Sequence, residues 1–224
     1  MSRFLKKINS VLFSRFYNEY PILLETEIAG DAESLLDVGC GDSSKMAKIA
    51  SMMKFSVGID NFEPRLQQGS EAKIYSEYRK MNILEIGDHF GPGSFDCVMA
   101  SDVIEHLKKE DGFRLLEMME RIARKKIIIF TPNGFLEQQA YDGNPLQIHL
   151  SGWDVDEMEK LGFRVIGVNG LKFLRGERTK IRWQPERLWF YISLLTQPFV
   201  RRAPRWAFQM LCIKEINGYK DTKQ

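Results

Sequence analysis

The sequence predicts an α/β fold with a mainly parallel sheet and helices on both faces of that sheet. Short apolar runs alternate with helical patterns from residue 34 to about residue 175. The run SLLDVG is short and apolar and ends in a glycine, which is typical of a buried parallel strand. Because parallel strands need crossover helices, this alternation favours one sheet covered on both sides. The 224 residues suffice for one such domain, 1–224.

The first half of the pattern contains three expected strands and two expected helices. The runs SLLDVG and FSVGID are short and apolar, and a weaker strand follows them. Serine is a favoured helix cap, and proline suits the first turn of a helix. We therefore expect strands at 34–39, 55–60 and 78–84, a helix from Ser43 or Ser44 to Met53, and a helix with Pro64 in its first turn.

The second half adds four strands and two helices. The run KKIIIFT is the clearest strand in the chain, and Pro132-Asn133-Gly134 closes it. Apolar residues at helical spacing, from Phe113 to Ile122, predict the longest helix. The expected strands are 95–101, 125–131, 163–168 and 208–213, with helices at 108–123 and 154–161.

Composition excludes some classes of protein and favours a cytoplasmic one. No uninterrupted apolar run of about 18 residues is present, so no segment is expected to span a bilayer. Cys40, Cys97 and Cys212 lie in apolar stretches without metal-ligand spacing, which predicts reduced, buried thiols. The net charge of +2 does not by itself indicate nucleic acid as a partner.

The N-terminal segment 1–30 is expected to be helical. Its first 18 residues are basic and amphipathic and contain no acidic residue. A transit peptide would have this composition. The preferred interpretation is a helix that packs its apolar side on the domain, with Phe4, Ile8, Leu12 and Phe16 on that side.

A glycine loop follows the first strand, in the segment Asp37-Val38-Gly39-Cys40-Gly41-Asp42. Ligands of open α/β sheets bind at the carboxyl ends of the strands, and glycine allows the backbone to approach them closely. A dinucleotide site would have a third glycine where this chain has Ser44. Asp37 and Asp42 would also repel a pyrophosphate, whereas they suit a ligand with an ammonium and a sulfonium group.

A second carboxylate, Asp60, ends the second strand about 20 residues after the glycine loop. At this position a carboxylate can accept hydrogen bonds from both hydroxyls of a ribose. The alternative is that Asp60 caps the helix that begins near Asn61. The nearby glycine loop favours the ribose interpretation.

Four segments together resemble the successive motifs of class I S-adenosylmethionine-dependent methyltransferases: LLDVGCGDS, VGID, FDCVMASDVIEHL and KKIIIFTPN. The resemblance covers about 30–175 and the last strand. It implies a Rossmann-like seven-stranded sheet whose last strand runs antiparallel between the fifth and the sixth. It also implies S-adenosylmethionine as the cofactor. The implied cofactor-binding residues are Asp37, Gly39, Cys40, Gly41, Asp60, Asn61, Asn82, Ile83 and Ser101.

Two of these positions have particular roles in the resemblance. Asn61 is expected beside the adenine. Asn82 stands where the family usually has an aspartate for the adenine amino group, and its side-chain carbonyl could accept the same bond. Ser101 and Asp102 are expected to border the methyl group and the substrate.

Candidate catalytic residues lie just after the fourth strand and after the fifth. Asp102, Glu105 and His106 would share one side of a helix, and His149 comes from a loop at the same sheet edge. Two carboxylates and two imidazoles suit Mg²⁺ or another divalent metal, which would activate an acceptor hydroxyl. The segment resembles the E-x-x-E-H segment of small-RNA 2′-O-methyltransferases and of ubiquinone-pathway O-methyltransferases, with Asp102 replacing the first glutamate.

Two alternatives stay open for these four residues. In the first, His106 or His149 acts alone as a general base without a metal. In the second, Glu105 and His106 only cap and pack the start of a helix. His89 lies in a turn-rich segment and is expected to be exposed.

An insertion, 175–206, precedes the last strand and is rich in basic and aromatic residues. It contains eight basic and two acidic residues, so it carries a net charge of +6 and the rest of the chain carries −4. Its many apolar residues predict a substrate lid. A contact of 183–202 with an anionic membrane surface and a dimer interface are the alternatives.

The sequence therefore predicts methyl transfer to an oxygen of a small-molecule or lipid-linked acceptor, with N-methylation as a variant. One alternative is a silent S-adenosylmethionine-binding scaffold that acts through its insertion. An RNA 2′-O-methyltransferase is another. The low net charge and the lack of an appended RNA-binding module disfavour nucleic acid.

Overall fold

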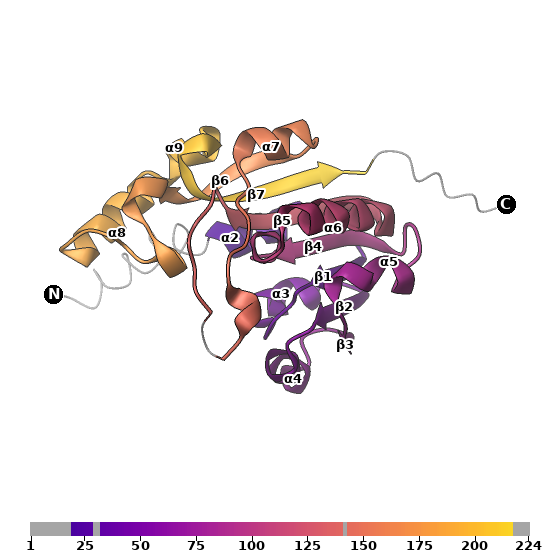
Figure 1. The fold of residues 1–224 in the computed structure, drawn as a ribbon. Coiled ribbons are helices and arrows are strands. Elements are labelled where there is room, and N and C mark those ends of the chain that lie inside the picture. The colour runs from indigo at the N-terminus through magenta and orange to yellow at the C-terminus, as the bar shows by residue number, and fades with distance from the viewer. Residues whose placement is uncertain (1–18, 29–31, 141–142, 217–224) are drawn as a thin grey trace.

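The computed structural model describes residues 19–28, 32–140 and 143–216. One seven-stranded sheet forms the centre of the molecule, in the order β3-β2-β1-β4-β5-β7-β6 (Figure 1). The first five strands are mutually parallel, and β7 is antiparallel to both β5 and β6. The predicted fold class and the antiparallel last strand are confirmed. The strands are β1 Ser34–Val38, β2 Phe55–Asp60, β3 Glu77–Lys80, β4 Phe95–Ser101, β5 Ala123–Pro132, β6 Arg164–Leu171 and β7 Ala207–Glu215.

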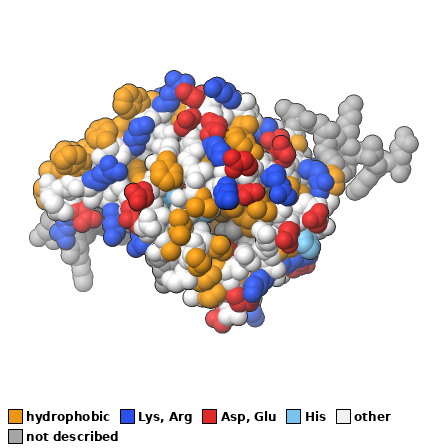
Figure 2. All heavy atoms as spheres, in the orientation of Figure 1, with side chains coloured by type: hydrophobic (Ala, Val, Ile, Leu, Met, Phe, Trp, Pro, Cys, Tyr) orange, Lys and Arg blue, Asp and Glu red, His pale blue; other side chains and the backbone are white. Residues whose placement is uncertain are grey.

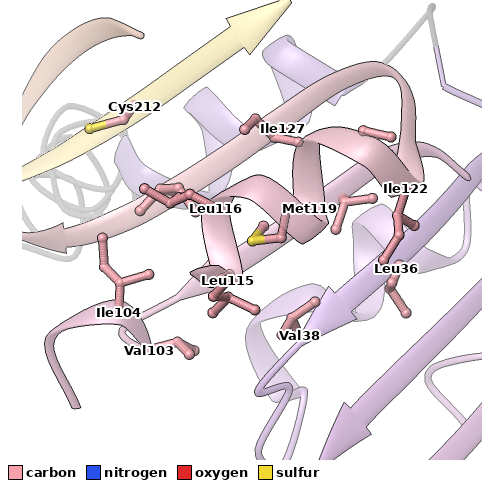
Figure 3. Packing of buried hydrophobic residues seen from close by; sticks show 14 of the residues in the cluster. Leu36, Val38, Val103, Ile104, Leu115, Leu116, Met119, Ile122, Ile127 and Cys212 are labelled. Atoms are coloured by element: carbon pink, nitrogen blue, oxygen red, sulfur yellow. The ribbon is translucent and has the colours of Figure 1, made fainter. Parts of the chain in front are cut away.

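Helices cover both faces of the sheet, because successive side chains of each strand point to opposite faces. In β1, Leu36 and Val38 belong to one buried cluster with α6, while Leu35 belongs to another with α2 and α3. Figure 3 shows the first cluster, with Leu115, Met119 and other α6 side chains packed over β1 and β5. The helices are α2 Glu19–Ile28, α3 Ala47–Ala50, α4 Glu63–Ala72, α5 Ile86–His89, α6 Lys109–Ile122, α7 Val155–Lys160, α8 Glu186–Leu195 and α9 Gln197–Arg202.

The first expected helix differs from the prediction in its length and in its cap. In place of one helix to Met53, a 3₁₀ turn at Ser44–Met46 leads into α3. Ser43 has a left-handed backbone (φ 59°) and makes no side-chain cap. The Ser44 N–H instead donates to Asp42 Oδ1 at 3.0 Å. This tight start keeps the glycine loop close to the end of β1.

The third strand is also shorter than predicted. It ends at Lys80, before a 3₁₀ turn at Ile83–Glu85. Asn82 caps this turn, since its Oδ1 accepts a hydrogen bond from the Leu84 N–H at 3.1 Å. A capping asparagine favours the turn over a longer strand.

The three cysteines are free and buried, as predicted. Among the described residues, no helix combines the length and the hydropathy that a membrane span requires. Most of the predicted N-terminal helical segment, 1–18 and 29–31, lies outside the described residues.

The insertion folds mainly into α8 and α9, which pack against β6 and extend to one side of the sheet (Figure 1). Gln197 fixes this packing. Its Nε2 donates to the Gly167 carbonyl at 2.9 Å, and its Oε1 accepts from the Gly170 N–H at 2.9 Å. Gly167 has no room for a side chain, because an added Cβ would lie 2.1 Å from the Val200 carbonyl oxygen. The insertion is therefore held in one orientation on the sheet.

Candidate functional site

A cavity of about 360 Å³ lies at the carboxyl ends of β1, β2 and β4. We call it the glycine-loop cavity. The switch in strand order between β1 and β4 separates the loops that follow these strands, which makes this edge the expected place for a ligand. Its lining includes six residues proposed from the sequence as cofactor-binding: Asp37, Gly39, Cys40, Gly41, Asp60 and Ser101.

Asp37 provides a buried carboxylate to this cavity. One of its oxygens, Oδ2, accepts a hydrogen bond from the Tyr75 hydroxyl. The other, Oδ1, is buried and has no hydrogen-bond partner among the described residues. Burial raises the pKa of Asp37 to about 7, and the nearby Asp60 adds to the increase. A cationic group of a ligand would satisfy the unpaired oxygen and favour its ionised form.

The two glycines have backbones that disfavour side chains. Gly39 has φ 74°, and a Cβ there would lie 2.5 Å from a methyl group of Val103. Gly41 has φ 54° and open space beside it. The backbone at Gly41 can therefore lie directly against a ligand.

Asp60 holds the glycine loop in place. Its Oδ2 accepts a hydrogen bond from the Gly41 N–H at 2.9 Å, and its Oδ1 accepts from the Phe62 N–H at 2.7 Å. Each carboxylate oxygen can accept more than one hydrogen bond. Asp60 can thus fix two backbone segments and still accept ribose hydroxyls. This geometry combines a turn-capping role with the expected ligand-binding role.

Three of the proposed cofactor residues do not line the cavity: Asn61, Asn82 and Ile83. The neighbouring Phe62 lines it instead of Asn61. The side-chain oxygen of Asn82 is already engaged by the Leu84 N–H. Adenine contacts of these three residues stay predictions.

A second cavity, of about 370 Å³, adjoins the first. We call it the insertion cavity, because Arg175, Thr179, Phe190, Leu194 and Gln197 of the insertion line it. Its lining also includes Phe130, Asn169, Gly170 and Gln209 from strands β5, β6 and β7. Tyr20, Lys45 and Asp102 line both cavities. A ligand in one cavity would therefore lie beside a ligand in the other.

Asp102 is the carboxylate at this boundary. Its Oδ1 accepts a hydrogen bond from Gln209 Nε2 at 3.1 Å. Burial raises the pKa of Asp102 to about 6, while the Lys45 charge and the Gln209 hydrogen bond oppose the increase. A carboxylate with this pKa is ionised at neutral pH and is still basic enough to accept a proton.

The shared helix face expected for Asp102, Glu105 and His106 is not formed. Asp102 has a left-handed backbone (φ 53°), and only a short 3₁₀ turn, Ile104–His106, follows it. The turn separates Asp102 from the cluster that the other two residues form. The sequence pattern could not indicate this, because aspartate adopts a positive φ only in particular contexts.

Glu105, His106 and His149 do converge, as the sequence predicted for residues of these two loops. One potential ligand atom from each lies within 4.8 Å of the other two. The rings of His106 and His149 are 4.7 Å apart between centroids. Asp102 is not part of this group. None of the three lines either cavity.

Both histidines have one ring nitrogen engaged by a backbone carbonyl. His106 Nδ1 lies 3.1 Å from the Ile148 oxygen, and His149 Nδ1 lies 2.6 Å from the Leu136 oxygen. Since a carbonyl only accepts, each Nδ1 carries the proton and each Nε2 has a lone pair. Burial lowers the pKa of both histidines, to about 4 for His106. Both imidazoles are therefore neutral at pH 7.

Glu105 is the buried member of this cluster. Its Oε2 accepts a hydrogen bond from the Thr131 hydroxyl at 2.9 Å, while Oε1 is buried without a partner among the described residues. Burial, followed by the charge of Asp102, raises the pKa of Glu105 well above its usual range. The cluster thus presents two neutral imidazole nitrogens and one carboxyl group, which a cation could bind with release of the carboxyl proton.

Several residues that line the cavities were not singled out from the sequence: Tyr20, Lys45, Phe62, Arg65, Asn144, Gln147, Arg175 and Gln209. Gln209 had a recognisable signal, because it is a polar residue inside the apolar run FQMLCI. Tyr20 donates a hydrogen bond to Ser101 Oγ at 2.7 Å, which fixes α2 over the boundary between the cavities. Nothing in the local sequence indicates that contact.

Comparison with known families and proteins agrees with this geometry. Residues 36–130 match the family described as "Methyltransferase domain". The matched segment runs from β1 to β5 and contains the glycine loop, Asp60 and Asp102. No curated protein matches the chain.

Solved structures of methyltransferases have the same fold. An S-adenosylmethionine-dependent methyltransferase from Archaeoglobus fulgidus is 20% identical, with 92% of this chain and 98% of that chain covered and a TM-score of 0.54. Magnesium protoporphyrin IX methyltransferase from Synechocystis PCC 6803, solved with bound S-adenosylmethionine, is 15% identical, with coverages of 96% and 85% and a TM-score of 0.52. The methyltransferase domain of bacterial CtHen1-C is 12% identical, with coverages of 91% and 100% and a TM-score of 0.60.

Proposed function

We propose that the chain is an S-adenosylmethionine-dependent methyltransferase that methylates an oxygen of a small-molecule or lipid-linked acceptor in the insertion cavity. The match of residues 36–130 to a methyltransferase domain and the shared fold of solved methyltransferases support this proposal. The observation that carries this proposal is the pair of adjoining cavities that share Tyr20, Lys45 and Asp102. The glycine-loop cavity has the carboxylates and glycines that suit the cofactor. The insertion cavity is lined by aromatic and aliphatic side chains together with polar ones such as Arg175 and Gln209, a combination that suits an organic acceptor.

The residues of the glycine-loop cavity fit S-adenosylmethionine. Asp37 has an unpaired oxygen for a cationic group, Gly41 has open space beside its backbone, and Asp60 lies at the end of β2 for the ribose. When bound there, the cofactor supplies a methyl group on a sulfonium, which is an excellent leaving group. Catalysis then depends on orientation and on removal of the acceptor proton.

We assign the removal of this proton to Asp102. It lines both cavities, and the hydrogen bond from Gln209 holds its carboxylate. Asp102 would accept the hydroxyl proton of the acceptor as the acceptor oxygen takes the methyl group, which the bound cofactor would supply with its thioether as the leaving group. His106 and His149, the bases considered from the sequence, line neither cavity.

The test is a search for the acceptor with S-adenosylmethionine labelled in its methyl group. The purified protein is incubated separately with a lipid extract, with water-soluble metabolites and with total RNA. We expect label in the lipid or the metabolite fraction, in a product whose mass spectrum places the new methyl on oxygen. Label confined to RNA would favour an RNA methyltransferase instead. Intact cofactor binding without transfer to any fraction would favour the scaffold alternative.

We further propose that Glu105, His106 and His149 bind a divalent cation. Each histidine donates its Nδ1–H to a backbone carbonyl, an arrangement that is common around metal-binding imidazoles. Two nitrogens and one carboxylate suit Mn²⁺ or Zn²⁺ better than Mg²⁺. A cation there would connect the turn after β4, which contains Glu105 and His106, to the loop that contains His149. Asn144 and Gln147 of the same loop line the glycine-loop cavity.

For this site, we expect Glu105→Gln and His149→Ala to weaken Mn²⁺ binding at least about tenfold in calorimetry. Since the pKa of Glu105 is raised, Mn²⁺ must displace its proton, and affinity should fall as pH falls. His89→Ala is the matched control, because His89 is exposed in α5, away from the cluster. Equal Mn²⁺ affinity in all variants, or no binding by the parent protein, would reject the site.

A further inference from the structure

The outer side of the insertion carries a continuous stripe of exposed apolar side chains. The stripe consists of Leu188, Tyr191, Leu195, Phe199 and Trp206, which are between 43% and 75% exposed. The first four follow one another at steps of three or four residues, so they lie on one side of the helical segment α8–α9. Figure 2 shows hydrophobic atoms gathered where α8 and α9 lie in Figure 1.

The opposite side of the same segment is buried. Ser193, Leu194, Gln197 and Val200 are at most 7% exposed. Ser193 Oγ accepts a hydrogen bond from Arg175 Nε at 3.0 Å, and Gln197 is bonded to β6. These polar anchors prevent the segment from rotating to hide the stripe. The exposed apolar side is therefore a fixed surface.

Basic side chains accompany the stripe. Arg187 and Arg202 are exposed beside the stripe on α8 and α9. Arg201 and Arg205 are also exposed, and Arg205 pairs with Asp156 at 2.5 Å. The insertion as a whole carries +6 while the rest of the chain carries −4. Apolar and cationic side chains on one exposed helical surface are typical of segments that lie in the headgroup region of an anionic membrane.

We propose that the α8–α9 stripe docks on an anionic lipid surface, with the apolar side chains at the acyl boundary and the arginines at the headgroup phosphates. A second copy of the chain fits less well, because a two-fold contact would place these arginines opposite one another. RNA also fits less well, because aliphatic side chains interrupt the aromatic ones along the stripe, and Leu195, its most exposed member, offers no ring on which a base can stack. A substrate lid uses the inner side of α8, where Phe190 and Leu194 line the insertion cavity, and leaves the stripe uncovered.

This docking would bring a lipid surface close to the insertion cavity. The cavity lies under the inner side of α8 and the stripe lies on its outer side, so about 10 Å, the diameter of a helix, separates them. This point rests on the proposed function: a cavity so close to the lipid surface favours a lipid-linked acceptor over a freely soluble one. The docking itself does not depend on methyl transfer.

The experiment is sedimentation of the full chain with vesicles of equal parts phosphatidylglycerol and phosphatidylcholine, and with vesicles of phosphatidylcholine alone. We expect binding to the anionic vesicles that added salt weakens. The double variant Leu195→Gln/Phe199→Gln should reduce the partition coefficient at least about tenfold, because its apolar contacts with the acyl boundary are lost. Phe135→Gln changes an equally exposed aromatic residue outside the insertion and is the matched control.

The first 18 residues are basic and could also bind anionic vesicles. For this reason the comparison among variants of the full chain decides the result. Unchanged partitioning of Leu195→Gln/Phe199→Gln would overturn the proposal, as would the absence of vesicle binding. Dimerisation that the same double variant abolishes would assign the stripe to a second copy. Circular dichroism and thermal unfolding, measured in parallel, verify that each variant is folded without relying on cofactor binding, which keeps this test separate from that of the proposed function.

Discussion

Replacement of Asp102 by Asn is expected to lower kcat for methyl transfer by about 10²–10⁴-fold, the usual effect of removing a general base. The amide has nearly the same shape as the carboxylate and can still accept the hydrogen bond from Gln209, but it cannot accept the acceptor proton. Asp102 lies at the boundary of the two cavities, and the substitution keeps the shape of its side chain. Affinity for S-adenosylmethionine should therefore change little, and calorimetry measures it on the same samples.

The pH profile provides the second readout for Asp102. A general base works in its ionised form, and burial raises the pKa of this carboxyl to about 6. In the parent protein kcat/KM, which reports the free enzyme, should rise with pH with a midpoint near the pKa of Asp102, about 6, and level off roughly one unit above it. The residual activity of Asp102→Asn should lack this step.

Asp88→Asn, a change of an exposed carboxylate in α5, is the control for these measurements. Full activity of Asp102→Asn, with the pH step retained, would eliminate Asp102 as the base. Loss of activity in Glu105→Gln alone would then move the chemistry to the Glu105, His106 and His149 cluster.

Asp60→Ala is expected to weaken S-adenosylmethionine binding at least about 100-fold, which corresponds to about 2.7 kcal/mol. The variant loses the acceptor for ribose hydroxyls and also the two bonds from the Gly41 and Phe62 N–H groups. Hydrogen bonds to a charged group contribute about 1.5–3 kcal/mol each. The loss therefore acts on the ligand directly and on the glycine loop that holds it.

Calorimetry with S-adenosylmethionine and S-adenosylhomocysteine measures this effect, with Asp88→Ala as the matched control. Both ligands should lose affinity, because both carry the ribose. Since Asp60→Ala also removes two internal bonds, urea unfolding must show that the variant is folded at the assay temperature. A folded Asp60→Ala protein that binds both ligands as tightly as the parent would remove Asp60 from the cofactor site.

The sequence predicted the parts of the fold that depend on local pattern. β1, the glycine loop and Asp60 are close in sequence, and parallel strands necessarily bring their carboxyl ends to one edge. The antiparallel β7 followed from the family resemblance, because no local pattern distinguishes its direction. Three cysteines in apolar runs were correctly expected to be buried.

The boundary between the cavities could not be predicted, because it depends on contacts between distant residues. Tyr20 bonds to Ser101, and Gln209 to Asp102, across 81 and 107 positions of the chain. The expected grouping of Asp102 with Glu105 and His106 assumed that the three residues belong to one helix. The left-handed backbone of Asp102 is incompatible with that geometry. The insertion was recognised from its composition, but its two-sided packing depends on Gly167 and Gln197.

The position of β7 between β5 and β6 has a consequence for the protein during its synthesis. Residues 207–215 leave the ribosome after the other six strands of the sheet, so until then β5 and β6 each lack their shared neighbour. Unpaired strand edges of this kind are prone to association with other chains. The same strand contains Gln209, which donates a hydrogen bond to Asp102. The nascent chain can thus form its glycine loop early, but Asp102 acquires its hydrogen bond from Gln209 only when the sheet closes.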